Sequence, residues 1–549
     1  MGPGASVVSR LHHRVDDQHH RVDDQLVRQS ISRLRPSSWL LVLIVTLDLI
    51  WAPSVAIGRP LMTTASADVG ATRSDGGSTG ADFNGDGFAD LAVGGGQRDI
   101  DVDDGAVVVV YGSPVGLTAK GSQIWSEKDF KRGFNGSFGA SVGQGDFDGD
   151  GFTDLAVGIP EARIGSLDAG EVRVIYRSSE GLTTAGSQLW SQNSPGIAGR
   201  AEAHDWFGGA LVAGNFGRGP EDDLAVGVNG ENDDAGAVNV IYGSGRGLSA
   251  TSNQLWSQES RGIAGKSEDL DAFGVSLAAG RFTGGAFADL AIGVPFDRVG
   301  RFETGAVDII NGSPSGLTAV GSRRWTQNSP GIAGRSEQGD EFGLSLAAGR
   351  FAGRASDDLA IGVPYENDNR GAVNVIYGST TGLSPRSNQI WSQASKGLAG
   401  TPEGGVDPDA FGSFLAAGNF GHDEGGRTAE DLAIRVPGES SGPNYETGIV
   451  QIVYGSRGGL TAANGQTLTH PGSDEGWSIG AGETALTASN FGYNSGDRIH
   501  DDLVIGLANS LDVIYGSGNG LNTKRHRVWS PSNLGHPEVW TGFGDALPA

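Results

Sequence analysis

The 549-residue chain contains no cysteine, which excludes a disulfide framework, a thiolate zinc site and a cysteine nucleophile. Basic residues are also scarce, since 39 Lys and Arg stand against 65 Asp and Glu and leave a formal charge of −26. A charge of this sign opposes electrostatic binding to nucleic acid or anionic lipid, so neither is expected as a partner. The 92 glycines follow no strict period, which excludes collagen and favours many short strands joined by turns.

The amino-terminal region has the order of a secretory signal. Trp39 to Trp51 is an apolar stretch that follows Arg33 and Arg35, and small residues come after it. The stretch is too short to span a bilayer comfortably, although a buried helix or a retained anchor stays open as an alternative. We therefore predict a signal peptide over residues 39–67, cleaved after Ala56 or Ala67. Secretion without later membrane insertion would follow.

The segments on either side of this signal are polar. Residues 1–38 contain the sequence HHRVDDQ twice in tandem, which has no place in an ordinary signal. We predict that this tract is disordered, or that it precedes a true translation start near Val27. Residues 68–80 are rich in Gly and Ser and form a predicted linker.

From residue 81 onward the sequence repeats itself. The segment Asp-Leu-(Ala/Val)-(Val/Ile) occurs seven times, at Asp90, Asp154, Asp223, Asp289, Asp358, Asp431 and Asp502. Each unit carries four strand-like pieces in a fixed order, as at residues 342–349, 358–364, 371–377 and 388–392. Four short strands make one blade of a propeller, so residues 81–549 predict an all-β, seven-bladed β-propeller with four-stranded antiparallel blades.

The first unit is incomplete, and the end of the chain supplies what it lacks. No Phe-Gly piece precedes Asp90, whereas one occurs at Phe543, beyond the last complete unit. The other Phe-Gly pieces are at Phe138, Phe207, Phe273, Phe342 and Phe411, with a degenerate copy at Trp477 to Gly480. We predict that the carboxy-terminal strand pairs into the amino-terminal blade and closes the ring, which removes open sheet edges.

A tryptophan recurs at one register of the fourth strand. It occurs at Trp125, Trp190, Trp256, Trp325, Trp391 and Trp529, and Leu468 takes its place in the remaining unit. Repetition in nearly every unit favours a packing role over an aromatic site that stacks on sugars.

Two units carry the pattern D-x-(D/N)-x-D-G-x-x-D between their first and second strands, at Asp82 to Asp90 and at Asp146 to Asp154. Oxygens at positions 1, 3, 5, 7 and 9 can converge on a hard cation, and Ca²⁺ takes six to eight oxygens. An EF-hand is excluded because position 12 is a valine inside a strand segment. We predict two calcium sites, with side-chain ligands Asp82, Asn84, Asp86, Asp90, Asp146, Asp148, Asp150 and Asp154 and with carbonyl ligands at Phe88 and Phe152.

The other five units lack the complete pattern, although its last acid is present in each of them. Retention of that Asp in every unit predicts a role in the turn in addition to any metal. Position 1 has become arginine in two units, at Arg281 and Arg350. We predict that each guanidinium replaces the cation by pairing with Asp289 or Asp358.

The combination of Phe-Gly, the acidic loop, Asp-Leu-Ala-(Val/Ile)-Gly and Gly-Ala-Val-x-(Val/Ile)-Ile-Tyr-Gly resembles FG-GAP repeats, those of the integrin α-chain head and of many bacterial secreted proteins. The resemblance covers residues 81–549. It implies a seven-bladed propeller with calcium under its lower face and partner contact through the loops of the opposite face. Only two loops are complete here, so the other blades are expected to be metal-free.

Function is less defined than fold, because propellers host both binding and catalysis. Gly76 to Gly80 matches G-x-S-x-G but lies in the linker, no H-E-x-x-H occurs, and the histidines are scattered. The sequence therefore favours an extracellular calcium-binding adhesion module, expected as a monomer, with a protein or glycan ligand. An extracellular hydrolase of phospholipase type, an accessory domain of one, and a purely structural surface scaffold stay open as alternatives. Acidic loops at Glu231 to Asp234 and Glu366 to Asp368 are candidate ligand contacts, although solvated turns are favoured.

Overall fold

A computed structural model describes most of the repeat region. The described residues are 80–95, 105–132, 136–178, 181–405, 408–423, 429–439, 448–469, 485–492, 500–507, 509–537 and 542–548. The chain divides into two compact units, Met1–Pro60 and Leu61–Ala549, and the description concerns the second. The predicted polar tract, the signal and its cleavage sites, the linker up to residue 79, and the degenerate Phe-Gly copy at residues 477–480 lie outside it.

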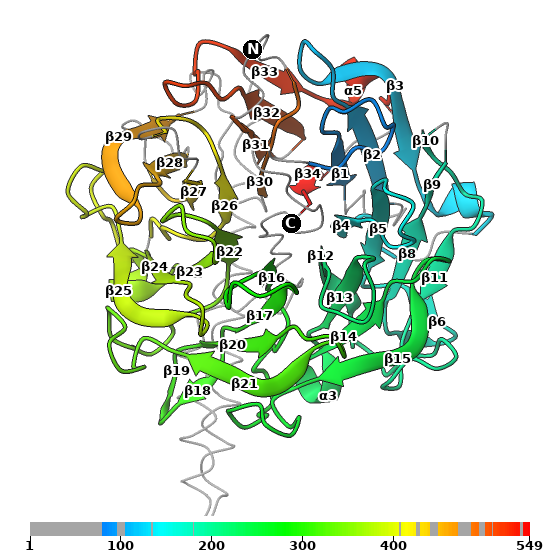
Figure 1. Ribbon diagram of the computed structural model, residues 1–549, viewed down its shortest axis with the longest axis horizontal. Coiled ribbons are helices and arrows are strands. Elements are labelled where there is room, and N and C mark those ends of the chain that lie inside the picture. Colours follow the sequence, from blue (N-terminus) through cyan, green and yellow to red (C-terminus); the bar gives the residue numbers. More distant parts are fainter. Residues whose placement is uncertain are drawn as a thin grey trace, which may run out of the picture. The chain divides into compact units, whose positions relative to one another are not determined.

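Seven four-stranded antiparallel sheets form a ring of blades (Figure 1). Blades are numbered along the chain, and the strands of each blade are given from the first, innermost strand to the fourth. Blade one contains β34 (Phe543–Ala546), β1 (Leu91–Gly95), β2 (Ala106–Tyr111) and β3 (Thr118–Trp125). Blade two contains β4 (Ser141–Gly145), β5 (Asp154–Ile159), β8 (Glu171–Ile175) and β11 (Gln188–Trp190). Blade three contains β12 (Phe207–Gly214), β13 (Asp223–Val228), β14 (Ala237–Tyr242) and β15 (Ser249–Trp256).

The remaining four blades repeat this order. Blade four contains β16 (Leu277–Gly280), β17 (Asp289–Val294), β20 (Ala306–Asn311) and β21 (Thr318–Trp325). Blade five contains β22 (Leu346–Gly349), β23 (Asp358–Val363), β24 (Ala372–Tyr377) and β25 (Ser384–Trp391). Blade six contains β26 (Leu415–Gly418), β27 (Asp431–Val436), β28 (Ile449–Tyr454) and β29 (Thr461–Leu468). Blade seven contains β30 (Leu486–Ser489), β31 (Asp502–Leu507), β32 (Ser510–Ile514) and β33 (His526–Trp529).

Short elements decorate the connections between these strands. They are η2 (Glu127–Phe130), α3 (Glu231–Asp234), α4 (Glu366–Asn369) and α5 (Pro531–Leu534), and the two-stranded hairpins β6 (Arg163–Ile164) with β7 (Leu167–Asp168), β9 (Arg177–Ser178) with β10 (Gly181–Leu182), and β18 (Arg298–Val299) with β19 (Phe302–Glu303). No helix in the ranges given above is long and apolar enough to cross a membrane.

The burial pattern follows from the position of each strand in its blade. The second strand is apolar on both faces, as in β23, where all six residues are buried. Both of its faces are covered by neighbouring blades, which is why its sequence is continuously apolar rather than alternating. The fourth strand lies at the rim, and β25 accordingly exposes residues in its middle. The predicted all-β propeller with seven four-stranded blades is therefore confirmed.

The ring closes as the sequence predicts. Strand β34 pairs antiparallel with β1, with Gly94 opposite Ala546 and Gly95 opposite Phe543. In Figure 1 the two strands lie side by side, β34 in red and β1 in blue. Phe543 and Leu547 are fully buried in an apolar cluster that also contains residues of blade seven. The carboxy-terminal strand thus completes blade one and gives it the innermost strand that its own unit lacks.

The tryptophan series lies at the ends of the outermost strands. Trp125, Trp325, Trp391 and Trp529 are buried, Trp190 and Trp256 are half-buried, and Leu468 is buried in blade six. Indole rings that are covered in this way are not available as a sugar-stacking surface, so the packing role is confirmed for the buried members.

Candidate metal centre

Both acidic loops lie on one face of the ring. Because successive strands of a blade run in opposite directions, the connections from first to second strand and from third to fourth strand share one face, here called the lower face. The connections from second to third strand, and from each blade to the next, form the upper face. Residues 82–90 (loop one) and 146–154 (loop two) occupy the lower face of adjacent blades one and two.

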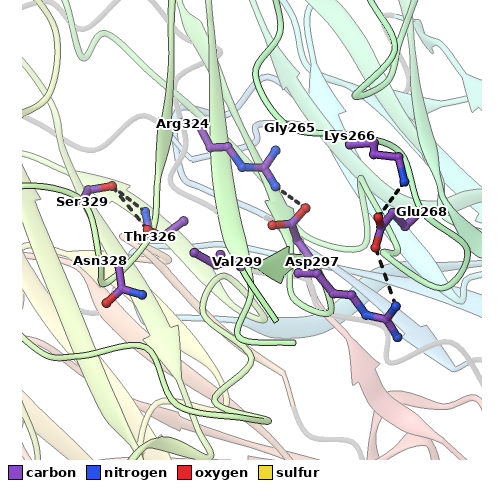
Figure 2. Close-up of a pocket in the computed structure, with 11 residues that line it drawn as sticks. Gly265, Lys266, Glu268, Asp297, Val299, Arg324, Thr326, Asn328 and Ser329 are labelled. Carbon is purple, nitrogen blue, oxygen red and sulfur yellow. Dashed lines mark hydrogen bonds and ion pairs between the residues drawn. The ribbon is translucent and has the colours of Figure 1, made fainter. Parts of the chain in front are cut away.

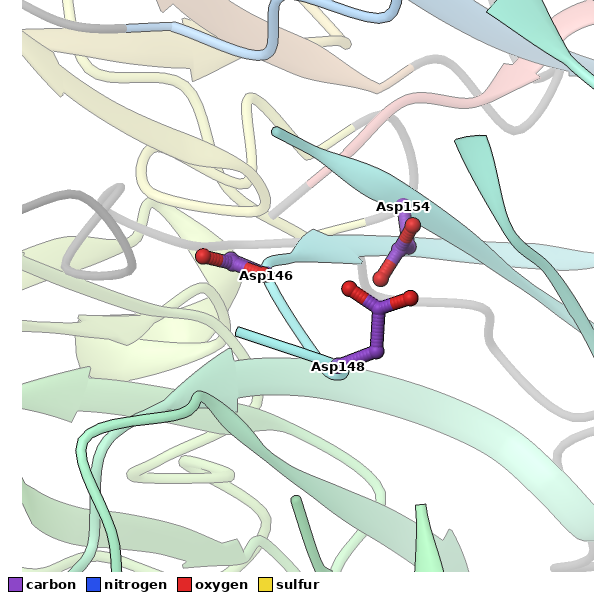
Figure 3. Close-up of side chains that lie close together, drawn as sticks. All are labelled: Asp146, Asp148 and Asp154. Atoms are coloured by element: carbon purple, nitrogen blue, oxygen red, sulfur yellow. The ribbon is translucent and has the colours of Figure 1, made fainter. Parts of the chain in front are cut away.

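Loop two brings three carboxylates together. Asp146, Asp148 and Asp154 each place one carboxylate oxygen within 4.8 Å of the others (Figure 3). Oδ2 of Asp146 accepts a hydrogen bond from the Gly151 N–H at 2.9 Å. Oδ1 of Asp146 is buried and has no hydrogen-bond partner among the described residues. A buried oxygen without a donor, beside two further carboxylates, fits the donor set that a hard cation requires.

The pKa values of the loop-two carboxylates also favour a cation site. Burial, the largest cause, and the neighbouring carboxylates of Asp148 and Asp150 together raise the pKa of Asp154 to about 8, against two backbone hydrogen bonds that lower it. Burial and adjacent acids also raise the pKa of Asp146 and of Asp148. Asp150 is among the acids that raise the pKa of all three residues, and a bound cation would offset this accumulation of negative charge.

The remaining predicted ligands of loop two lie outside this group of three. Asp150 accepts the Phe152 N–H at 2.9 Å through Oδ1, so its carboxylate closes the turn rather than joining the cluster. Gly151 has φ of +87°, the left-handed conformation that the glycine of the pattern permits at its sharp turn. The structure thus assembles three of the five predicted ligand residues, and the roles of Asp150 and of the Phe152 carbonyl stay predictions.

Loop one has the same backbone course but a different set of side-chain contacts. Asp82 accepts backbone N–H groups of its own loop, including the Gly87 N–H at 2.9 Å. Asn84 donates from Nδ2 to Asp86 Oδ2 at 3.2 Å, and Asp86 Oδ1 accepts the Phe88 N–H at 3.0 Å. Because position 3 is an amide, loop one offers one carboxylate fewer than loop two. Its metal site stays a prediction.

The last acid of the pattern has the same structural role in all seven blades. Its Oδ1 accepts an N–H from a residue just beyond the third strand, and its Oδ2 accepts an N–H from the turn that precedes the second strand, at 2.7 to 3.1 Å. The seven residues, here called the clamp aspartates, are Asp90, Asp154, Asp223, Asp289, Asp358, Asp431 and Asp502. All are at most 2% exposed. The predicted turn role of this residue is confirmed.

The predicted arginine pairs are wrong. Within the described residues no ion pair joins Arg281 to Asp289 or Arg350 to Asp358. The oxygens of both clamp aspartates already accept backbone N–H groups, so a guanidinium is not needed to satisfy them. The backbone N–H of Arg281 instead donates to Asp357 of the next blade at 2.7 Å.

On the upper face, a buried glutamine joins neighbouring blades in four places. The pairs are Gln192 with Glu231, Gln258 with Asp297, Gln327 with Glu366 and Gln393 with Glu439. In each pair the amide Nε2 donates to a carboxylate of the following blade. Glu231 and Glu366 belong to the acidic loops noted in the sequence, whereas the four glutamines were not predicted. A signal for the glutamines exists, because W-(S/T)-Q-x-S-x-G-(I/L)-A-G occurs at the end of the fourth strand of the same four units.

The acidic upper-face loops are solvated turns. In α3, Asn232 and Asp233 have φ of +55° and +60°, and α4 shows the same left-handed turn. Asn and Asp tolerate this conformation better than other side chains. The leading acids Glu231 and Glu366 are engaged by glutamines, and the residues that follow them are exposed. This arrangement fits the favoured interpretation of these loops as turns.

A polar cavity of about 420 Å³ lies between upper-face connections of blades three and four (Figure 2). Its charged side chains are paired with one another. Lys266 contacts Glu268 at 2.7 Å, Arg298 contacts Glu268 at 3.8 Å, and Arg324 contacts Asp297. Because these charges are paired within the lining, the cavity is not assigned to a charged ligand.

Histidine pairs in the described region have structural surroundings. His526 Nδ1 lies 2.8 Å from Asp512 Oδ1 on adjacent strands. His536 Nε2 lies 3.2 Å from Ser122 Oγ, which also contacts the carbonyl oxygens of Ala119 and Leu534 and so ties α5 to β3. These contacts join strands and turns, and neither pair lines the cavity of Figure 2.

Comparison with known proteins agrees with the geometry. Residues 138–175, which span the first three strands of blade two and loop two, match the family model of the FG-GAP repeat. Together with the closed ring of seven four-stranded blades, this match supports an FG-GAP β-propeller.

Individual relatives extend the similarity to about half of the chain. The chain is 30% identical to integrin alpha-5 of Xenopus laevis over 240 residues, which is 41% of this chain and 20% of the relative. It is 28% identical to integrin alpha-PS2 of Drosophila melanogaster over 266 residues, 47% and 17% of the two chains. It is 30% identical to phosphatidylinositol-glycan-specific phospholipase D of Homo sapiens over 208 residues, 36% and 24% of the two chains. The matched region is thus a quarter or less of each relative's length.

Proposed function

We propose that this chain is a secreted FG-GAP propeller that binds two calcium ions on its lower face and serves as an extracellular binding or adhesion module. The observation that carries the proposal is the cluster of Asp146, Asp148 and Asp154 with its buried, unpartnered oxygen. Similarity to two integrin α chains supports a binding role. The upper face is the surface proposed to contact a protein or glycan partner, with the propeller as a monomer.

In this proposal the loops of blades one and two hold calcium as a structural ion. Calcium would supply the positive charge that the carboxylates of loop two lack. Asp146 lies just after β4 and Asp154 begins β5, so a shared ion would join the first and second strands of blade two. Loop one would hold the second ion through Asp82, Asn84, Asp86 and Asp90 and the carbonyl of Phe88.

Calcium is expected to raise the melting temperature of the purified protein, and Asp146→Asn is expected to remove most of the increase due to loop two. A ligand that binds only the folded state at 100 times its dissociation constant stabilises it by about 2.7 kcal/mol. Differential scanning calorimetry in calcium and in chelator measures the effect. Glu259→Gln, which changes an exposed upper-face acid, should respond to calcium as the wild type does. Equal melting temperatures in calcium and chelator would show that the loops bind no structural ion.

The binding role is tested by immobilising the protein and recovering ligands from extracellular material with and without calcium. We expect a specific partner that is retained in calcium and reduced in the double variant Asp82→Asn, Asp146→Asn. Recovery of the partner by the double variant at the wild-type level would show that the metal loops are not required for partner binding. Recovery of no partner would contradict the adhesion proposal itself.

A second candidate function is an accessory domain of an extracellular hydrolase. The similarity over 208 residues to phosphatidylinositol-glycan-specific phospholipase D is the observation that favours it. Release of a glycan-linked phosphatidylinositol substrate by the purified chain alone would favour this alternative over a binding module. A purely structural scaffold would show neither this release nor a retained partner.

A further inference from the structure

Blade two differs from every other blade at the residue that follows the third strand and its closing Tyr or Asn. Six blades have glycine there, namely Gly112, Gly243, Gly312, Gly378, Gly455 and Gly516, whereas blade two has Arg177. A side chain has therefore been placed on the lower face at a point where the fold otherwise has none. This point lies between loop one and loop two.

The guanidinium of Arg177 contacts both loops. Nε donates to the Phe83 carbonyl at 3.1 Å and Nη2 donates to the Asn84 carbonyl at 2.8 Å, so it holds positions 2 and 3 of loop one. Its central carbon lies 3.4 Å from the ring centroid of Phe152, which occupies position 7 of loop two. A planar cation can donate hydrogen bonds in its plane and stack on an aromatic ring at the same time, which lysine cannot do.

The backbone of the same residue is also engaged in loop two. The Arg177 N–H donates to Oδ1 of Asp154, the clamp aspartate of blade two, at 2.9 Å. Arg177 thus joins two backbone carbonyls of one loop to two ligand positions of the other.

A second contact links the loops directly. The N–H of Asp82 at position 1 of loop one donates to Oγ1 of Thr153 at position 8 of loop two, 3.2 Å away. The corresponding contact of loop two leads away from loop one, because the Asp146 N–H donates to Asp222 of blade three at 3.1 Å. The two loops therefore contact each other both directly and through Arg177. The other blades have glycine at the position of Arg177 and lack the side-chain contact.

We propose that Arg177 couples the two calcium loops, so that filling one increases the calcium affinity of the other. The inference rests on the proposed calcium sites and adds to them a cooperative relation and the residue that produces it. Ordering of Phe152 and Asp154 in loop two holds the Arg177 guanidinium in place, which in turn fixes the Phe83 and Asn84 backbone of loop one. A loop that is already ordered loses less conformational entropy when it binds an ion.

The coupling is measured by titrating the metal-free full chain with calcium alone in a calorimeter. Asp146→Asn leaves loop one, Asp82→Asn leaves loop two, and the wild type has both. The coupling factor is the product of the two stepwise association constants of the wild type, divided by the product of the two single-site constants. We expect a factor of at least about five in the wild type, the lower end of ordinary coupling between sites.

Repeating the set in the Arg177→Gly background, which places the residue of the other six blades there, is expected to lower the factor towards one while both sites still bind. The contact between Asp82 and Thr153 stays in place in this variant. Arg354→Gly is the matched control, since Arg354 lies 5.8 Å from the Tyr377 ring centroid in blade five, away from both loops. This control should keep the wild-type factor. If Arg177→Gly does not fold, Arg177→Lys keeps the charge without the planar fork and should lower the factor.

The outcomes separate this inference from the function on which it rests. Two independent sites in the wild type, or an unchanged factor in Arg177→Gly or Arg177→Lys, overturn the coupling and leave the calcium proposal intact. Absence of any calcium binding overturns both.

Discussion

Deleting residues 543–549 is expected to unfold or strongly destabilise the propeller. The deletion removes β34 and with it the innermost strand of blade one, and it uncovers the edge of β1. Phe543 and Leu547 are fully buried, and burying two such side chains stabilises a fold by about 3 to 6 kcal/mol. Because whole domains are stable by only about 5 to 15 kcal/mol, most of the stability of the ring is at risk. Thermal and denaturant unfolding measure the loss.

A single substitution makes the same test less severe. Phe543→Ala leaves the strand in place and is expected to cost about 3 to 5 kcal/mol. Val320→Ser is the control, because Val320 is 80% exposed on the outer strand of blade four and should change stability by about 0.5 kcal/mol at most. A truncated protein that melts at the wild-type temperature would show that the ring does not depend on its closing strand.

Asp358→Ala is expected to lower the free energy of unfolding by about 2 to 6 kcal/mol, although blade five has no complete acidic loop. Asp358 accepts the Gly378 N–H and the Ala352 N–H at 2.8 and 3.0 Å, and both bonds are buried. Alanine leaves two buried donors without an acceptor, and each such donor costs about 1 to 3 kcal/mol. Asp358→Asn keeps one acceptor oxygen and should cost less. Asp368→Asn, an exposed acid of the same blade, should have almost no effect.

The same variants have an expected pH dependence. Burial, the largest cause, and the neighbouring Asp357 together raise the pKa of Asp358 from its ordinary value of 3.8 to about 7, against two backbone hydrogen bonds that lower it. The folded state therefore keeps this proton at pH values where the unfolded chain has lost it. Its contribution to stability is greatest below pH 4 and falls as the pH rises towards 7, by about 1.4 kcal/mol per unit within that window. Asp358→Asn does not titrate, so its deficit relative to the wild type should shrink between pH 5 and pH 7. A deficit that grows with pH would contradict the raised pKa.

The fold could be predicted from the sequence because the same strand motifs recur in every blade. Asp-Leu-Ala-(Val/Ile)-Gly marks the second strand of each blade, and its covering on both faces requires the continuous apolar run. The additional Phe-Gly at Phe543 predicted a strand that completes blade one, since the first unit lacks its own first strand. Trp325 and its equivalents could be assigned to packing for the same reason, because a ligand site would not recur in nearly every unit.

Side-chain partners could be predicted less well. The proposed pairing of Arg281 with Asp289 assumed that the retained acid needs a cation, whereas backbone N–H groups satisfy it. Arg177 reaches Phe83 across a blade boundary, and no spacing in the sequence indicates a contact between residues 94 positions apart. The glutamine–carboxylate pairs of the upper face also cross between blades. Their repeated motif was visible, but its partners depend on how the blades pack.

The clamp aspartates fix the lower-face turn of each blade by accepting two backbone N–H groups, and these hydrogen bonds require no metal. A lower-face loop can have Asn, Arg or Ala in place of its other acids and still form the turn, because its last acid joins the turn to the end of the third strand. The acids that are proposed to hold calcium can therefore differ from loop to loop without loss of the turn. In this chain the complete pattern, with Asp or Asn at its third position, occurs only in two neighbouring blades, the pair that includes the seam where the ring is joined.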